Sequence, residues 1–261
     1  MTALVAACAV AGLILGSFAN VVIWRVPRGE SIVSPASACP RCGHRLRWWE
    51  NIPVVSFAIL RGRCARCRER IPWRYPAVEL ATAALFAATA LWRGPSPDLA
   101  AYLLLGFVAV VLAAIDAAHH RLPNAIVLPA IPALVALLVP ALATGVGEAG
   151  DLLRALAGGA ALGAFYGAIA LVSPRGMGMG DVKLAGLLGI ALGWIGWDAL
   201  IVGAFAAFVL GAAAGTVIAL VRGTGRRTVI PFGPWMLVGA AVGLVAGPAL
   251  VAAYLAAMGI A

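Results

Sequence analysis

The sequence predicts an all-α protein that crosses a membrane several times. Three observations carry this prediction: 63% of the 261 residues are hydrophobic, only 11% are charged, and the mean hydropathy is +1.01. A soluble domain carries roughly 25% charged residues, so this chain has too little charge to cover a water-exposed surface. Its apolar runs are continuous and approach the length of about 20 residues that a spanning helix needs. They lack the alternating pattern of a membrane barrel.

Eight apolar segments are candidate membrane spans. They cover residues 3–24, 76–92, 99–115, 125–142, 152–172, 183–197, 199–221 and 235–257. The first has no basic segment before its apolar run, so we interpret it as a mature span and not as a signal peptide. The fourth is expected to be broken by Pro129, Pro132 and Pro140, and the sixth is short. Breaks of this kind are tolerated where neighbouring helices satisfy the freed backbone groups.

The basic residues predict how the spans are oriented. Of the 19 lysines and arginines, 17 lie in or beside four segments, 25–75, 116–124, 173–182 and 222–234. Basic loops stay in the cytoplasm, so we expect these four segments to be cytoplasmic and both termini to be on the other side. The net charge of +9 is then explained by topology and by contact with anionic membrane lipid, and we expect no nucleic-acid partner.

The segment 25–75 is the one substantial polar part of the sequence. It contains CPRC and CARC, two C-x2-C pairs separated by 21 residues, and these supply Cys39, Cys42, Cys64 and Cys67. Four thiolates at such a spacing predict a closed, structural Zn²⁺ site. The metal would supply folding free energy that so small a loop cannot gain from a core. The alternatives are free thiols or disulfides, and a reducing cytosol disfavours disulfides.

Two aspartates lie at the predicted cytoplasmic ends of apolar segments. Asp116 is in AVVLAAIDAAHHRLPN and is expected to face the water of a short loop, and Asp181 is in GMGMGDVKL. A carboxylate at the edge of hydrocarbon is costly unless it is hydrated, paired or neutralised, so it points to function. Because both are expected on one membrane face, we predict a pair that shares a proton, as in aspartic proteases. A helix-capping role for Asp181 stays open.

Four further residues are candidates for contacting a substrate. Gly178 and Gly180 are expected to allow unusual backbone angles and to let a substrate strand lie beside Asp181. Lys183 either interacts with that carboxylate or extends to the membrane interface. Glu79, inside the second span, has either a structural or a substrate-contact role.

These motifs resemble those of a known family. GMGMGDVKL resembles the G-x-G-D signature of membrane aspartyl proteases, in the extended form of bacterial type IV prepilin leader peptidases. IDAAHHRLPN resembles the first catalytic motif of that family, although Ala118 stands where many members carry a second acidic residue. The blocks GSFANVVIWRVPRGES, ENIPVVSFAILRGRC, RYPAVELATAALF and IPFGPWMLVGA extend the resemblance over nearly the whole chain.

The resemblance implies an activity and a location. Members cleave the short basic leader of prepilins and pseudopilins after a glycine, at the inner membrane and from its cytoplasmic side, for type IV pili or type II secretion. Many then methylate the new N-terminus with S-adenosylmethionine. By the same resemblance Asp116 and Asp181 are the catalytic pair and the four cysteines bind metal. The chain would comprise a first helix (1–24), a zinc-binding loop (25–75) and a seven-helix protease core (76–261).

Two other functions fit parts of the sequence. A proton-coupled transporter would also place Asp116 and Asp181 among helices, but it would show inverted repeats, and it does not need a four-cysteine loop. A membrane-tethered zinc-binding interaction protein would explain the loop but would tolerate replacement of both aspartates. The sequence shows no glycine-rich nucleotide fingerprint, so it does not locate a methyl-donor site, and it leaves the oligomeric state open.

Overall fold

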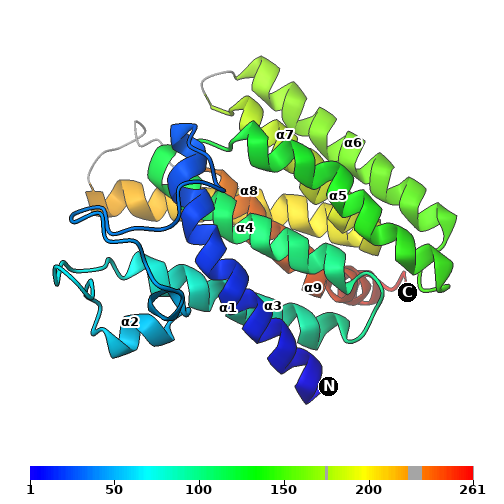
Figure 1. Cartoon of the computed structure of the whole chain (residues 1–261). Coiled ribbons are helices and arrows are strands. Elements are labelled where there is room, and N and C mark those ends of the chain that lie inside the picture. Colours follow the sequence, from blue (N-terminus) through cyan, green and yellow to red (C-terminus); the bar gives the residue numbers. More distant parts are fainter. Residues whose placement is uncertain (174–175, 223–230, 261) are drawn as a thin grey trace. The chain divides into compact units, whose positions relative to one another are not determined.

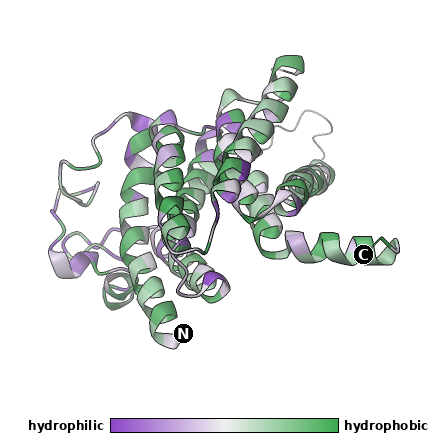
Figure 2. Cartoon of the chain, turned by 90° about the vertical axis from the view of Figure 1, so that its right-hand side faces the viewer, coloured by the Kyte–Doolittle hydropathy of each residue, from purple (hydrophilic) through white to green (hydrophobic). Residues whose placement is uncertain are grey.

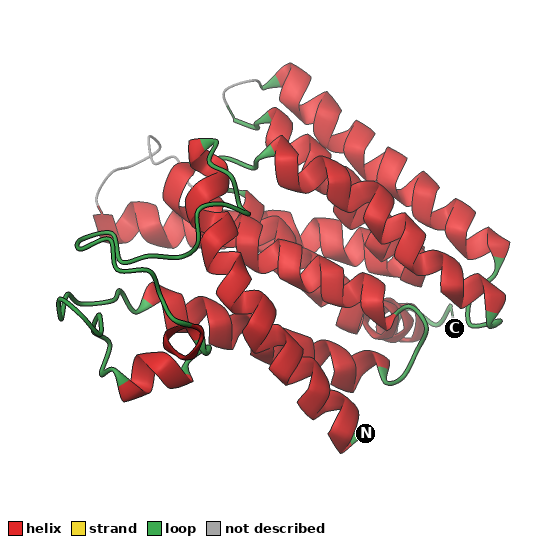
Figure 3. Cartoon of the chain, viewed as in Figure 1, coloured by secondary structure: helices red, strands yellow, loops and turns green. Residues whose placement is uncertain are grey.

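The computed structural model describes residues 1–173, 176–222 and 231–260 (Figure 1). Over these residues the regular structure is helical, with loops and turns between the helices and no named strand (Figure 3). The predicted all-α fold class is therefore confirmed. The chain forms two compact units, Met1–Ile115 and Asp116–Ala261, and each is described by itself. The three-part division that the resemblance implies is a different one and stays a prediction.

The helices follow the predicted spans closely. The long ones are α1 (Thr2–Arg25), α3 (Arg74–Arg93), α4 (Leu99–His119), α5 (Asn124–Ala143), α6 (Ala149–Val172), α7 (Met179–Ile195), α8 (Trp197–Arg222) and α9 (Gly233–Ala257). The short helices η1 (Val26–Arg28), η2 (Trp48–Asn51) and α2 (Val55–Ile59) lie in the polar segment. Among the described residues, seven helices are long and apolar enough to cross a membrane, and α7 with 17 residues is apolar but shorter. Figure 2 shows hydrophobic colour along most of the helical surface.

One expectation about the helices was wrong. The fourth span is one continuous helix, α5, although Pro129, Pro132 and Pro140 lie inside it. Each proline removes one backbone donor, but in apolar surroundings leaving the helix would expose many more unpaired groups. The helix of the third span, α4, extends four residues past the predicted end at residue 115, to His119. Asp116 therefore belongs to a helix.

In the first unit, α1 and α3 pack with their backbones in close approach. A Cβ atom at Gly12 would lie 2.6 Å from Ala83 Cα, and one at Gly16 would lie 2.7 Å from Glu79 Cα. Asn20 adds a polar link, since its Nδ2 donates to the carbonyl of Tyr75 at 3.1 Å. Small residues thus allow the tight contact that brings Glu79 against α1.

In the second unit, two helix pairs pack in the same way. Gly158 of α6 lies against Gly189 of α7, where an added Cβ would be 2.8 Å from the Gly189 carbonyl oxygen. Gly239 of α9 lies against Ala207 of α8, where an added Cβ would be 2.5 Å from the Ala207 nitrogen. These close pairs fix α7 and α9, whose first turns carry the candidate site.

Candidate functional site

Asp116 lies in the last turn of α4, and its side chain is buried, with 5% of the residue exposed. The expectation that it faces loop water is therefore wrong, because the helix continues past it. Its Oδ2 accepts a hydrogen bond of 3.1 Å from the backbone N–H of Gly233. Gly233 is the first residue of α9, and Pro234 follows it without an N–H of its own. The start of a helix offers unpaired N–H groups and a positive partial charge, so it stabilises a carboxylate.

Only glycine fits at position 233. An added Cβ would lie 2.7 Å from Asp116 Oδ2 and 3.3 Å from its Cγ. The first of these distances is shorter than real Cβ contacts allow, so any side chain would displace the carboxylate. The sequence did not assign a role to Gly233, although IPFGPWMLVGA contains it. The one signal available was a glycine directly before a proline at a predicted helix start.

Asp181 is the third residue of α7, and it is partly buried. Its Oδ2 accepts the backbone N–H of Gly178 at 3.0 Å, so the helix-capping geometry that was left open does occur. The charge of Asp116 acts on Asp181, and the charge of Asp181 acts on Tyr166. The two carboxylates lie in one compact unit and act on each other electrostatically, as two groups that share a proton must. That they form a catalytic pair stays a prediction.

The glycines before Asp181 do not adopt the unusual backbone angles that were expected, and the approach of a substrate strand to them stays a prediction. Unlike six other glycines of the chain, Gly178 and Gly180 do not have a positive φ, so no unusual backbone angle requires them. Gly180 is needed for space, because an added Cβ would lie 3.0 Å from Leu122 Cβ. Leu122 also lies 3.4 Å from the Cβ position of Gly233. Leu122 thus contacts the first turns of both α7 and α9.

Lys183 joins two helix starts. Its Nζ donates to Asn124 Oδ1 at 2.8 Å, which links the first turns of α7 and α5. No ion pair between Lys183 and Asp181 is present in the described part of the chain. The expected interaction of Lys183 with Asp181 is thus not seen among the described ion pairs, and its extension to the membrane interface stays a prediction.

Glu79 lies in the first unit, where it is buried at 8% exposure. Its Oε2 accepts the N–H of Val54 at 2.7 Å, and its carboxylate is also hydrogen-bonded by Ser17. Val54 has φ of +59°, which is strained for a β-branched residue. Glu79 therefore holds the end of the polar segment against α1 and α3, and a contact with substrate stays a prediction.

The four cysteines form one cluster. Their Sγ atoms all lie within 4.8 Å of one another. Each C-x2-C pair makes the same turn: Gly43 N–H donates to the Cys39 carbonyl at 3.0 Å, and Arg68 N–H donates to the Cys64 carbonyl at 3.1 Å. Gly43 and Arg68 both have a positive φ, +68° and +61°. Two matching turns that present four sulfurs to one point fit a tetrahedral metal ion.

The electrostatics of the cluster favour a bound cation. Backbone N–H groups of Cys67 and Arg66 lower the pKa of Cys64 to about 6. At Cys67 a hydrogen bond from Glu69 acts in the lowering direction, but burial and the neighbouring thiols raise its pKa to about 12. Thiols this close together resist ionising together, and a divalent metal would supply the positive charge that stabilises four thiolates.

Glu50 supports the loop beside the first cysteine pair. Its Oε2 accepts the Arg47 N–H at 2.8 Å and lies 3.0 Å from His44 Nε2. The Arg47 hydrogen bond, with a further contribution from His44, holds the pKa of this buried carboxyl below its usual value. Glu50 is therefore an ionised anchor for the segment that follows Cys42.

Fold and site define a class: a multi-pass helical membrane protein with an interacting aspartate pair and a four-cysteine cluster. The chain belongs to the type IV leader peptidase family. The family model of that description matches residues 102–219, and a model described as the bacterial peptidase A24 N-terminal domain matches residues 10–93. This confirms the resemblance found in the sequence.

Curated relatives cover almost the whole chain. A prepilin leader peptidase/N-methyltransferase of Pseudomonas putida is 34% identical over 96% of this chain and 93% of its own length. Proteins with the same name from Pseudomonas aeruginosa and Burkholderia pseudomallei are 35% and 38% identical, over 94% and 91% of this chain and 91% and 84% of their own lengths. No solved structure matches the chain. The transporter alternative gains no support from these comparisons.

Proposed function

We propose that this chain cleaves the leader of prepilins or pseudopilins and N-methylates the new N-terminal residue. The relatives that match it over most of its length are named for both activities. The observation that supports the peptidase most directly is the pair of interacting carboxylates. Asp181 lies in the first turn of α7 and Asp116 in the last turn of α4, and each accepts one backbone N–H at a helix start. Hydrolysis of a peptide bond needs both an acid and a base, and a carboxylate pair supplies them.

The pair would act as one unit that holds a single proton. The ionised carboxylate of Asp116 and Asp181 takes a proton from water, whose oxygen attacks the scissile carbonyl carbon. The protonated partner donates a hydrogen bond to the carbonyl oxygen and stabilises the tetrahedral intermediate. When the C–N bond breaks, the amine nitrogen receives a proton from the pair, which returns to its starting state. The N–H groups of Gly233 and Gly178 keep the two carboxylates in place throughout.

We propose further that Cys39, Cys42, Cys64 and Cys67 bind one structural Zn²⁺, which the sulfur-only donor set and the matching turns support. The charge distribution supports an inner-membrane location with the cysteine segment and the aspartate pair on the cytoplasmic side. The leader of a prepilin would meet the pair there. S-adenosylmethionine would be the methyl donor.

The test compares aspartate variants on one substrate. A tagged prepilin is co-expressed with the wild-type chain, Asp116→Asn or Asp181→Asn, and leader loss is measured by mass spectrometry. Asp198→Asn is the matched control, because Asp198 also lies in the first turn of a long helix of the same unit. We expect each site variant to lose roughly 100-fold or more in cleavage rate while the control is unaffected. Full processing by either site variant would remove that residue from the pair.

A further inference from the structure

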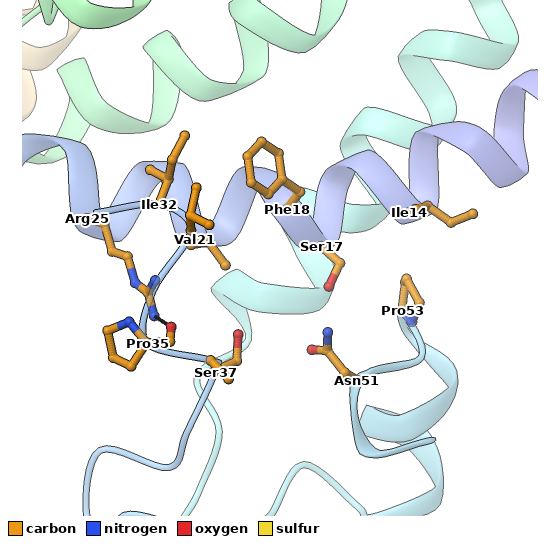
Figure 4. Close-up of a pocket in the computed structure, with 12 residues that line it drawn as sticks. Ile14, Ser17, Phe18, Val21, Arg25, Ile32, Pro35, Ser37, Asn51 and Pro53 are labelled. Atoms are coloured by element: carbon orange, nitrogen blue, oxygen red, sulfur yellow. Dashed lines mark hydrogen bonds between the residues drawn. The ribbon is translucent and has the colours of Figure 1, made fainter. Parts of the chain in front are cut away.

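A cavity of about 320 Å³ lies along α1 in the first unit (Figure 4). Figure 4 shows Arg25 with Pro35 at one end of it and Ser17 towards the other. Among the described residues that line it there is no carboxylate, so this cavity cannot supply the acid and the base that hydrolysis needs. The second unit, in contrast, holds both aspartates of the proposed peptidase and a deeply buried tyrosine, Tyr166.

Tyr166 lies in α6, and only 1% of it is exposed. It is the largest of the fully buried side chains in the described chain. A buried tyrosine usually has a hydrogen-bond partner for its hydroxyl, because an unpaired hydroxyl costs free energy. Within the described residues the Tyr166 hydroxyl makes no hydrogen bond, as donor or as acceptor. It therefore keeps its full capacity to donate to a neighbouring acceptor.

Helix packing places Tyr166 at the level of Asp181. An added Cβ at Gly167 would lie 3.7 Å from Val182 Cγ1, and one at Gly163 would lie 3.9 Å from the Val182 carbonyl oxygen. Tyr166 precedes Gly167 and Asp181 precedes Val182, so both residues lie beside this contact between α6 and α7. The charge of Asp181 acts on Tyr166, and no other described charge does. The Asp181 carboxylate is thus the acceptor that this hydroxyl can serve.

The ring of Tyr166 is held by two phenylalanines. Its centroid lies 5.4 Å from that of Phe208 in α8 and 6.2 Å from that of Phe232, and the two phenylalanine rings lie 5.4 Å apart. Phe232 directly precedes Gly233, whose N–H holds Asp116. Rings packed in this way stabilise one another and restrict each other's motion. One fixed side chain therefore lies beside the first turns of both α7 and α9.

We propose that Tyr166 is a positioning residue of the peptidase, whose hydroxyl donates a hydrogen bond to the Asp181 carboxylate, directly or through one water. The inference rests on the proposed function and assigns roles within the pair. A donor to a carboxylate stabilises the ionised form over the protonated form. Asp181 is then the member that takes a proton from the attacking water, and Asp116 is the member that holds the shared proton. Such hydrogen bonds tighten when substrate is bound.

The other titratable groups around Asp181 are compatible with this assignment. Asp116 acts on Asp181 as the second carboxylate of the pair, and His120 acts on Asp116. Lys183 is hydrogen-bonded to an asparagine of α5 and forms no ion pair with Asp181 in the described chain. Helices α5 and α9 carry no charged side chain, and the charged residues of α8 lie at its two ends. A change at the Tyr166 hydroxyl should therefore act through the ionisation of the pair.

The test measures kcat and KM for leader cleavage against pH, with the purified full chain in detergent. Tyr166→Phe keeps the ring and removes the hydroxyl, so we expect kcat to fall about tenfold with little change in KM. Without the donor a higher pH is needed to ionise the base, so the acidic limb of the profile should move up by about one pH unit.

Two further enzymes make the test specific to the hydroxyl. A fluorinated tyrosine incorporated at position 166 has a more acidic hydroxyl, which donates more strongly, so it should move the acidic limb to lower pH. Tyr102→Phe is the matched control, because Tyr102 is also buried but lies in the first unit. Its pH profile should match that of the wild type. Melting temperatures show that each enzyme is folded.

Two results would overturn the proposal. One is a Tyr166→Phe enzyme with wild-type kcat and an unmoved pH profile while Asp116→Asn and Asp181→Asn are inactive, which would leave the proposed peptidase intact. The other is a shift of the acidic limb in the same direction by phenylalanine and by the fluorinated tyrosine, because a structural disturbance acts alike in both. Full cleavage by the aspartate variants would contradict the proposed function itself, and this inference with it.

Discussion

The hydrogen bond between Gly233 and Asp116 allows a sharp test of how the acid pair is held. In Gly233→Ala the new Cβ would lie 2.7 Å from Asp116 Oδ2, whereas ordinary contact begins at 3.4 Å. The carboxylate must therefore move by about 0.7 Å (3.4 − 2.7) or lose its 3.1 Å bond to the backbone N–H. A hydrogen bond to a charged group is worth about 1.5–3 kcal/mol, so we expect kcat to fall roughly 10- to 100-fold.

The assay measures kcat and KM for leader cleavage by purified enzyme in detergent. We expect KM to change little, because the N–H of Gly233 holds the carboxylate and does not contact substrate. The matched control is Gly150→Ala in α6 of the same unit, where an added Cβ would meet no atom within 4 Å. It should leave both the melting temperature and kcat close to wild type. Equal falls of kcat in both variants would refute the positioning role of Gly233.

Three further outcomes are expected. The wild-type chain should contain about one zinc ion. Cys64→Ser should lose that ion, and its loop should be cut faster by trypsin, because the metal contributes to folding. A Cys64→Ser variant that keeps its full zinc content would contradict this. Glu50→Gln should speed tryptic cleavage of the loop at neutral pH. The lowered pKa keeps the native carboxylate ionised there, so it accepts a charge-assisted hydrogen bond from the Arg47 N–H that the neutral amide of glutamine cannot replace in full. Lys183→Ala and Asn124→Ala should each reduce the cleavage rate less than about tenfold, because each removes the one exposed hydrogen bond between these two side chains. The double variant should be no slower than either single variant, since the same bond is lost in all three.

The sequence was sufficient to predict those structural features for which physical chemistry allows only one arrangement. A chain this apolar must form spanning helices, so the helix positions were predicted within a few residues. Four cysteines in two short pairs were predicted to converge, and their sulfurs lie together. The continuity of α5 was missed, because proline propensity measured in water does not include the cost of opening a helix in an apolar medium.

The finer structure of the site depends on contacts between segments far apart in the chain. Gly233 is 117 positions from Asp116, and neither residue's local pattern indicates the hydrogen bond between them. For the same reason the roles of Lys183 and Glu79 were left open, since each is decided by a partner in another helix or loop, Asn124 and Val54.

One requirement accounts for two glycine motifs that look unrelated in the sequence. A carboxylate buried in apolar surroundings needs donors, and the first turn of a helix is where backbone N–H groups have no partner within the helix. Both aspartates use such a group, Asp181 from Gly178 before α7 and Asp116 from Gly233 in α9. The approach is so close that a side chain at Gly233 would collide with the carboxylate, and one at Gly180 would press on Leu122. Glycine at position 233 is therefore a consequence of how the Asp116 carboxylate is solvated by backbone, and a substitution there should affect catalysis before it affects folding.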